Sequence, residues 1–210
     1  MYKYEGLGCI YWHMVSKLLL ATAEVIQAAS EKRVARERLS PLMERFDDIK
    51  DGLGLHKRPA LYGAFPIDPY SHTTGFSGVQ QPGMTGQVKE DVITRFCELG
   101  VNVSGGAISF SPVMLRRDEF VSEPVSWSFS TGGMMQSEDL ETGSMAFTLC
   151  GVPVIYRLAE SSGVHVYSGR ADPEFIPGHR LGLTWSKSVF RRENRVKKLV
   201  VDLPENMLRP

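Results

Sequence analysis

The stretch GVNVSGGAISFSPVML, residues 100–115, decides how the chain is divided. Before it, apolar side chains recur at steps of three and four, which is the period of an amphipathic helix. Within it, two short alternating runs flank a glycine turn at 104–106, the pattern of a β-hairpin. Gly100 stands where a glycine often ends a helix. We therefore expect a helical segment over residues 1–99 and a β domain over residues 100–210.

Short alternating segments, separated by Gly, Pro and Ser turns, follow this hairpin. We expect strands at residues 125–129, 145–149, 152–158, 164–166, 181–185 and 196–203. The phase of the alternation reverses at Gly151, which predicts a bulge or bend there. Runs of this kind predict an antiparallel β-sandwich, so we expect the α+β class, with helices first and the sandwich second.

A strongly apolar helix is expected near the start of the chain, from Ile10 to about Arg38. Its apolar stripe includes Leu18, Leu19, Val25 and Ile26. Further apolar side chains widen this stripe, so the helix needs cover on much of its circumference. We expect the stripe either to pack against a second chain or to form an exposed apolar patch.

Two further helices are expected in the first half. Ser40 and Pro41 are typical of a helix start, and Gly52 is typical of the end of that short helix. A third helix is expected from its capping residue Thr85 to Leu99. The apolar stripe of the third helix is Val88, Val92, Phe96 and Leu99.

The connection over residues 52–84 has neither a helical nor a strand period. Its apolar residues are too numerous for a solvated linker: Leu61, Tyr62, Phe65, Ile67, Tyr70, Phe76 and Met84. Long connections without secondary structure are usually functional or disordered. We therefore expect an ordered loop that presents its polar groups to a ligand.

The composition excludes several classes of protein. Lys plus Arg equals Asp plus Glu at 24 each, so no global field attracts the chain to nucleic acid. The apolar run from Gly6 to Ile26 is interrupted by Lys17 and Glu24, which fits neither a membrane span nor a signal peptide. We expect a cytoplasmic protein that binds neither nucleic acid nor membrane.

No sequence pattern indicates a metal or a cofactor. Cys9, Cys97 and Cys150 are widely spaced without a CxxC, so we expect reduced, packed thiols. His56 and His72 belong to no ligand signature such as HExxH. The dinucleotide pattern GxGxxG and the phosphate loop GxxxxGK[ST] are both missing.

The junction at Gly100 resembles that of carbohydrate enzymes built from an α/α barrel and a β-sandwich, such as the maltose- and cellobiose-phosphorylase-like families and related glycoside hydrolases. Their pattern G-x-x-V-x-x-G-x-L-x-F-x-P is approximated by Gly100, Val103, Gly106, Ile108, Phe110 and Pro112. The resemblance covers roughly residues 10–205. It implies the C-terminal portion of a carbohydrate-active protein, with residues 1–99 as a barrel remnant. No residue matches the general acid of these families, so the resemblance assigns no catalytic residue.

Polar residues in and beside the long loop are the candidate substrate-binding residues: Asp68, Tyr70, His72, Gln80, Gln81 and Gln87. Neutral amides suit sugar hydroxyls because they both donate and accept hydrogen bonds. Asp68 lies between two prolines that restrict its backbone, and glycoside cleavage needs carboxyl groups held in pairs. The structural alternatives are an Asx-type turn at Asp68 and a backbone contact at His72.

Two functions follow as alternatives. In the first, the chain is the C-terminal part of a glycoside hydrolase-like or phosphorylase-like protein, and residues 62–90 close one side of a sugar-binding cleft. That hypothesis expects a carbohydrate ligand and either a second chain or an N-terminal region that supplies the barrel. In the second, the chain is a non-catalytic β-sandwich interaction module whose helical extension, residues 10–50, docks on a partner protein.

Overall fold

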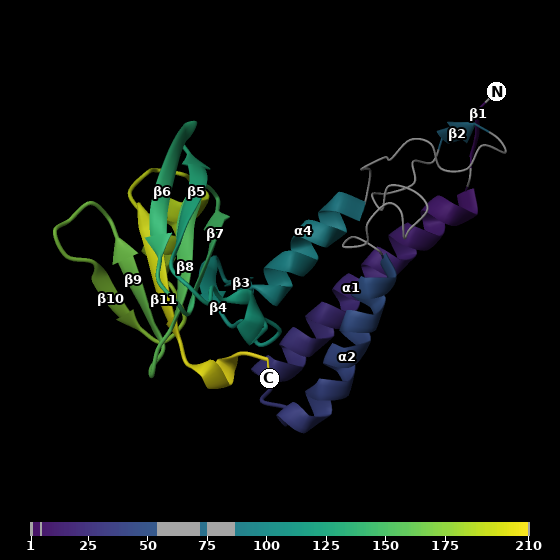
Figure 1. Cartoon of the computed structure of the whole chain (residues 1–210), viewed down its shortest axis with the longest axis horizontal. Coiled ribbons are helices and arrows are strands. Elements are labelled where there is room, and N and C mark those ends of the chain that lie inside the picture. Colours follow the sequence, from purple (N-terminus) through teal and green to yellow (C-terminus); the bar gives the residue numbers. More distant parts are fainter. Residues whose placement is uncertain (1, 5, 54–71, 75–86, 210) are drawn as a thin grey trace. The chain divides into compact units, whose positions relative to one another are not determined.

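The structure is a computed structural model of the 210-residue chain. It describes residues 2–4, 6–53, 72–74 and 87–209, with side chains over residues 14–52 and 89–209. The chain divides into two compact units, Met1–Glu98 and Leu99–Pro210 (Figure 1). The described helices of the first unit precede the sheets of the second, which confirms the predicted α+β class.

Three described helices form most of the first unit: α1 (Gly6–Glu31), α2 (Arg36–Leu53) and α4 (Gln87–Glu98). α1 packs along both α2 and α4. The strands β1 (Tyr2–Tyr4) and β2 (His72–Thr74) form a short antiparallel ladder. The buried apolar residues of α1 and α2 are Leu19, Ala23, Ile26, Leu39, Met43 and Phe46. They form the apolar core of this unit's described part.

The first helix is shorter at its C-terminal end than the predicted range to Arg38. α1 ends at Glu31, and Arg33 adopts a left-handed φ of 56°. The Val34 N–H bonds to the carbonyl of Ala29, so the chain turns within the polar run EKRVARER instead of continuing as a solvated helix end. The helical period of a charged segment does not by itself show where the chain reverses.

The second helix begins earlier than predicted. α2 starts at Arg36 rather than at Ser40 and Pro41, and Pro41 lies inside it. The earlier start places Leu39 on the same face as Met43 and Phe46, and all three are buried. Burial of this stripe offsets the one backbone hydrogen bond that Pro41 cannot donate.

The third predicted helix is confirmed as α4, and Gly100 follows it with a φ of 67°. Its predicted buried face is confirmed only in part: Leu99 is buried and Phe96 is half-buried, but Val92 is 49% exposed. The polar residues Glu90, Thr94 and Glu98 are buried as well. α1, which packs along α4, also buries polar residues: Ser16, Thr22 and Gln27. Helix packing in this unit therefore buries polar side chains.

The second unit begins with the predicted hairpin, β3 (Val101–Ser104) and β4 (Ala107–Phe110). A second hairpin joins β5 (Val125–Thr131) to β6 (Met134–Leu140). The main sheet has the order β10-β9-β11-β8-β7. Its strands are β7 (Ser144–Leu149), β8 (Val152–Leu158), β9 (Gly163–Tyr167), β10 (Glu174–Pro177) and β11 (Lys198–Leu203). Neighbours are antiparallel except β8 and β11, which are parallel, so the prediction of antiparallel pairing holds only in part.

One face of the main sheet is wholly apolar at its centre. Register places Leu199 between Val154 and Val166, so that these side chains share a face. Residues of this face with no exposed surface are Val154, Tyr156, Val164, Val166, Leu199 and Val201. The rings of Phe110 and Phe147 meet Tyr156 edge to face, with centroids 6.0 and 5.2 Å away. This face is the core of the unit.

The opposite face of the sheet is covered in part by the β5–β6 hairpin. Leu140 of β6 packs with Ile155 and Val200, and Trp127 of β5 packs against the same cluster. Lys198 of β11 bonds to Glu138 of β6, with Nζ 2.8 Å from Oε2. The hairpin is thus held on the sheet by both apolar and charged contacts.

The change of direction predicted near Gly151, as a bulge or bend, is a hairpin turn and not a bulge. Cys150 and Gly151, with φ of 53° and 82°, form a two-residue turn between β7 and β8, and Leu149 lies opposite Val152. The alternation changes phase because the chain reverses there, as left-handed two-residue turns allow.

The segment 181–185, predicted as a strand, is also different. It leads into helix α5 (Leu183–Phe190), with Gly182 as the N-cap residue. Ser186 of this helix accepts a hydrogen bond from the backbone N–H of Ile108, which anchors α5 on β4. Two strands, β6 and β10, carry no alternation clear enough for the sequence to predict them.

Candidate functional site

Most candidate residues of the sequence lie outside the described part. Asp68, Tyr70, Gln80 and Gln81 fall in the undescribed ranges. His72 begins β2 and pairs with Tyr4, and Gln87 begins α4, but their side chains are not described. Their role in substrate binding therefore stays a prediction.

The second unit contains a pocket where the chain passes from β10 into α5. Gly178 turns the chain with a φ of 81°, and Arg180 then bridges to Ser109 of β4. The Leu181 N–H donates to the carbonyl of Ile108 at 2.8 Å. Residues 179–181 thus extend the β4 edge and bring the start of α5 beside β10.

This pocket has a volume of about 640 Å³ and a mixed lining. The lining residues are Ala107, Glu174, Ile176, Arg180, Leu181, Gly182, Leu183, Thr184 and Trp185. Leu183 is 51% exposed although it is a large apolar side chain. A pocket of this size suits a small ligand, and volumes of roughly 300–1,000 Å³ are usual for such sites.

Trp185 makes two directional contacts at the wall of this pocket. Its indole Nε1–H donates to Oε1 of Glu174 at 3.0 Å. The guanidinium carbon of Arg195 lies 5.9 Å from the centre of the Trp185 ring, within range of a cation–π interaction. Two contacts therefore favour the observed orientation of the indole at the pocket wall.

The first turn of α5 is anchored by hydrogen bonds of Ser186. The Ser186 hydroxyl accepts from the Ile108 N–H at 3.0 Å and donates to the Leu181 carbonyl at 3.3 Å. Ser186 has no exposed surface. Trp185 directly precedes this anchored residue, so the bonds of Ser186 help to position the backbone that carries the indole.

The pocket combines an aromatic ring with one carboxylate and one guanidinium. Arg180 bonds only weakly to the Ser104 carbonyl, at 3.4 Å, and both Arg180 and Glu174 are exposed. Such a set can cover an apolar ligand face and bond to its hydroxyls. Among the described lining residues Glu174 is the one carboxylate, whereas glycoside cleavage normally needs two. The arrangement fits binding better than hydrolysis.

A second polar cluster lies on the sheet itself. Asp202 of β11 accepts from Arg157 Nε at 2.8 Å, and its other oxygen lies 2.8 Å from His165 Nε2. These residues come from three adjacent strands, so the parallel pairing of β8 with β11 is what assembles them. The Phe175 ring packs 5.0 Å from the imidazole. We interpret this cluster as structural: an Arg157–Asp202 ion pair to which His165 adds a hydrogen bond.

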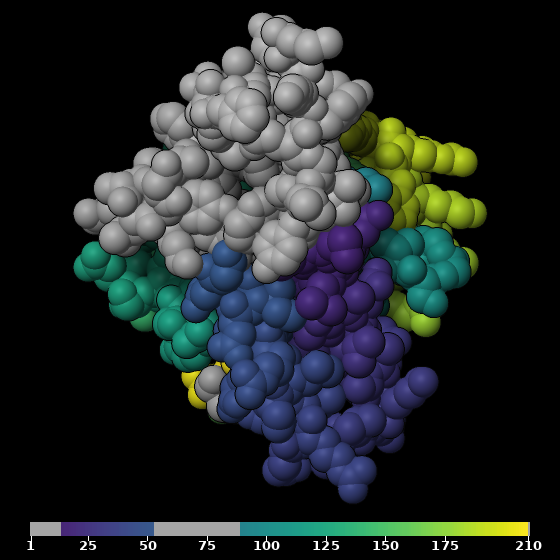
Figure 2. Space-filling model, turned by 90° about the vertical axis from the view of Figure 1, so that its right-hand side faces the viewer, coloured from purple at the N-terminus to yellow at the C-terminus, as the bar shows by residue number. Residues whose placement is uncertain are grey.

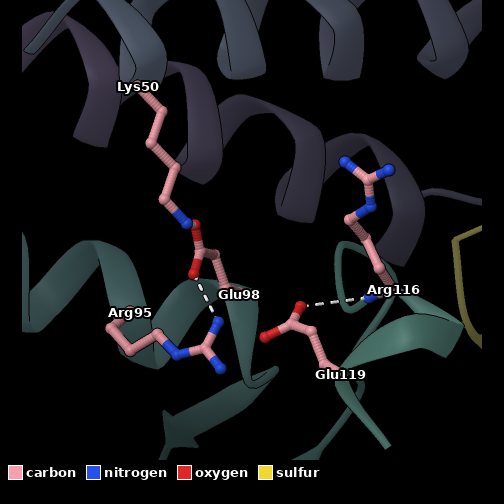
Figure 3. A network of polar contacts seen from close by, with 5 residues as sticks. All are labelled: Lys50, Arg95, Glu98, Arg116 and Glu119. Atoms are coloured by element: carbon pink, nitrogen blue, oxygen red, sulfur yellow. Dashed lines mark hydrogen bonds and ion pairs between the residues drawn. The ribbon is translucent and has the colours of Figure 1, made fainter. Parts of the chain in front are cut away.

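The first unit carries a charged cluster around Glu98. Lys50 of α2 and Arg95 of α4 both reach its carboxylate, as Figure 3 shows, with Arg95 Nη1 2.6 Å from Oε2. Neighbouring Cys97 is partly buried and free. Burial, together with the carboxylates of Glu24 and Glu98, raises the pKa of the Cys97 thiol to about 11.

Cys97 is therefore expected to be a poor nucleophile. Because only the thiolate reacts, a pKa near 11 leaves about 0.1% reactive at pH 8, so alkylation should be roughly 100-fold slower than at an ordinary thiol. The rate should rise about tenfold per pH unit up to about pH 10. Iodoacetamide labelling followed by peptide mass spectrometry measures this, with Cys150 read in the same digest. Labelling of Cys97 at pH 8 as fast as a small-molecule thiol would contradict the prediction.

Other cavities, metal-binding groups or membrane-spanning helices among the described residues would also bear on function. A second cavity, of about 580 Å³, is lined by Arg117, Asp118, Phe120, Val121, Ser122 and Thr142. Across the described side chains, no group of three or more His, Cys, Asp or Glu could hold a metal ion. None of the described helices has the length and apolar character needed to cross a bilayer.

Sequence reasoning missed the Trp185 pocket because it predicted a strand over residues 181–185. The residues of the pocket come from β4, β10 and α5, so no local spacing connects them. A usable signal was the turn-rich stretch PGHRLG shortly before Trp185, since loops that position an aromatic often serve binding.

Comparison with known proteins adds no assignment: no protein-family model matches the chain, and no curated protein is detectably similar to it.

Proposed function

We propose that this chain binds carbohydrate as a non-catalytic C-terminal part of a carbohydrate-active protein, of the glycoside hydrolase or phosphorylase kind that its junction resembles. The observation that carries the proposal is the held indole of Trp185 in a pocket with Glu174 and Arg180. A fixed aromatic ring can lie against the apolar face of a sugar ring. The carboxylate and guanidinium are suited to its hydroxyls.

We also propose a more specific architecture for the two units. We take the β5–β6 hairpin and the main sheet as the two layers of a sandwich, and the helices as derived from an α/α barrel. Packing of Leu140 and Trp127 on the sheet supports the first point. The second is supported by α1, whose apolar residues occur on exposed as well as buried sides. Helices of an α/α barrel are covered on more than one side, and apolar residues on several sides of a helix are typical of such burial.

The test is a screen of oligosaccharides against the full chain, followed by calorimetry on any ligand found. Trp185→Ala should weaken binding by roughly 2- to 10-fold, because loss of one aromatic contact costs about 0.5–1.5 kcal/mol. Phe175→Ala is the matched control, since Phe175 is 53% exposed on β10 and does not line the pocket. Equal affinity in Trp185→Ala and the unaltered chain would overturn the proposal, as would a screen without any ligand.

A further inference from the structure

α1 carries two apolar faces. One is buried within the first unit and contains Leu19, Ala23 and Ile26. The other is the exposed stripe, which we define as Met14, Leu18, Ala21, Val25 and Ala28. Met14 is 63% exposed, and Leu18 and Val25 are each 55% exposed. Figure 2 shows side chains of α1 and α2 at the surface of this unit.

The spacing of the exposed stripe is that of a helix-pairing seam. Its residues follow one another at steps of four, three, four and three, the a/d pattern of a coiled coil. The stripe spans about 21 Å at 1.5 Å per residue. The alanines at 21 and 28 allow a facing helix to approach closely, since interaxial distance depends on the side chains at the contact. A contiguous apolar stripe of this kind is typical of an interaction surface.

The charges beside the exposed stripe indicate the occupant. Lys17 and Glu24 are seven residues apart, so they flank the same edge of the stripe. Both are exposed, and neither has an ion pair among the described side chains. A basic and an acidic residue separated by one heptad form a self-complementary pair. A second copy of the same helix, running in the opposite direction, offers Glu24 to Lys17 and Lys17 to Glu24.

Antiparallel packing also matches the apolar positions. Heptad geometry then sets Leu18 of one copy against Ala21 of the other, so that a large side chain meets a small one. Parallel packing would set Lys17 beside Thr22 instead. Thr22 is buried, and its hydroxyl donates to the Leu18 carbonyl at 2.8 Å, so it offers nothing to a lysine. The charges therefore favour the antiparallel arrangement.

We propose that two copies of this chain associate through the exposed stripe of α1, antiparallel about a two-fold axis, with Lys17 of each copy paired with Glu24 of the other. A two-fold axis makes the interface isologous, as in most homodimers. This interface is independent of the Trp185 pocket, so either proposal can fail without the other.

Sedimentation of the full chain at micromolar concentrations tests the association. We expect a dimer, and Leu18→Glu should weaken it by at least roughly 100-fold, because each dimer loses two buried leucines. Met135→Glu is the matched control: Met135 is 71% exposed on β6, outside the stripe. Circular dichroism checks that both variants keep their helices. A monomeric unaltered chain, or a Leu18→Glu variant that dimerises normally, overturns the proposal.

A charge exchange tests the orientation. Lys17→Glu and Glu24→Lys should each weaken the dimer by roughly 2- to 30-fold, because two exposed ion pairs become like-charge contacts. The double variant carrying both changes should restore the affinity to within about threefold, since the pairs are re-formed with the signs exchanged. Additive weakening in the double variant would refute antiparallel pairing, and so would single variants that have no effect.

Discussion

Replacing Gly100 by alanine is expected to lower the free energy of unfolding of the second unit by about 3 kcal/mol or more. Gly100 has a φ of 67°, a left-handed conformation that costs an L-residue roughly 1–2 kcal/mol. In addition, a Cβ there would overlap the backbone of Ser111 and Pro112, which cannot swing aside as a side chain can. The Gly100 carbonyl accepts the Ser111 N–H at 2.7 Å, so the two segments are held together by hydrogen bonding.

Gly105→Ala separates the two causes. Gly105 also has a positive φ, 58°, but nothing lies within 4 Å of the position that an alanine Cβ would take there. Gly105→Ala should therefore lower the free energy of unfolding only by the cost of the left-handed conformation, roughly 1–2 kcal/mol. Urea unfolding followed by tryptophan fluorescence gives both values. Equal losses for Gly100→Ala and Gly105→Ala would show that the close approach to Ser111 contributes nothing.

Replacing Tyr156 by alanine is expected to cost about 3–5 kcal/mol, the range for deleting a fully buried aromatic ring. Tyr156 has no exposed surface, and Phe110 and Phe147 both pack edge-on against it. Its hydroxyl donates to the Leu99 carbonyl at 2.6 Å. The side chain therefore ties β8 to the residue at which the second unit begins.

Tyr156→Phe isolates the hydroxyl. It keeps the ring contacts and leaves the buried Leu99 carbonyl without this donor, which should cost about 1–3 kcal/mol. The difference between the phenylalanine and alanine variants then measures the ring. A phenylalanine variant as stable as the unaltered chain would mean that the bond to Leu99 adds no net stability.

Local patterns predicted those strands in which alternation and turn residues agree. The β3–β4 hairpin, β5, β7, β8, β9 and β11 all follow this rule. β6 was missed because MMQSEDL places polar residues on both faces, five of its seven side chains being exposed. The parallel pairing of β11 with β8 was out of reach, since about forty residues separate the strands and no local spacing encodes it.

The burial pattern of the helices was harder to predict than their existence. Hydrophobicity alone placed Val92 in the core of α4, whereas buried Glu98 is held there by Lys50 and Arg95. Arg95 is only three residues from Glu98, but Lys50 is 48 residues away, so this part of the charge compensation has no local sequence signal. The same limit applies to the pocket: Trp185 bonds to Glu174, eleven residues away on another element, and the sequence shows neither α5 nor that pairing.

The most direct test of carbohydrate binding in the Trp185 pocket is an NMR titration of the ¹⁵N-labelled full chain with the best oligosaccharide of the screen. The chain has three tryptophans. The indole N–H signal that disappears in Trp185→Phe belongs to Trp185, whose Nε1–H donates a hydrogen bond to Glu174. We predict that this signal and the backbone signals of Gly182 and Leu183 shift together with one dissociation constant. Saturable shifts confined to other residues, with the Trp185 signal unmoved, would contradict the proposed site.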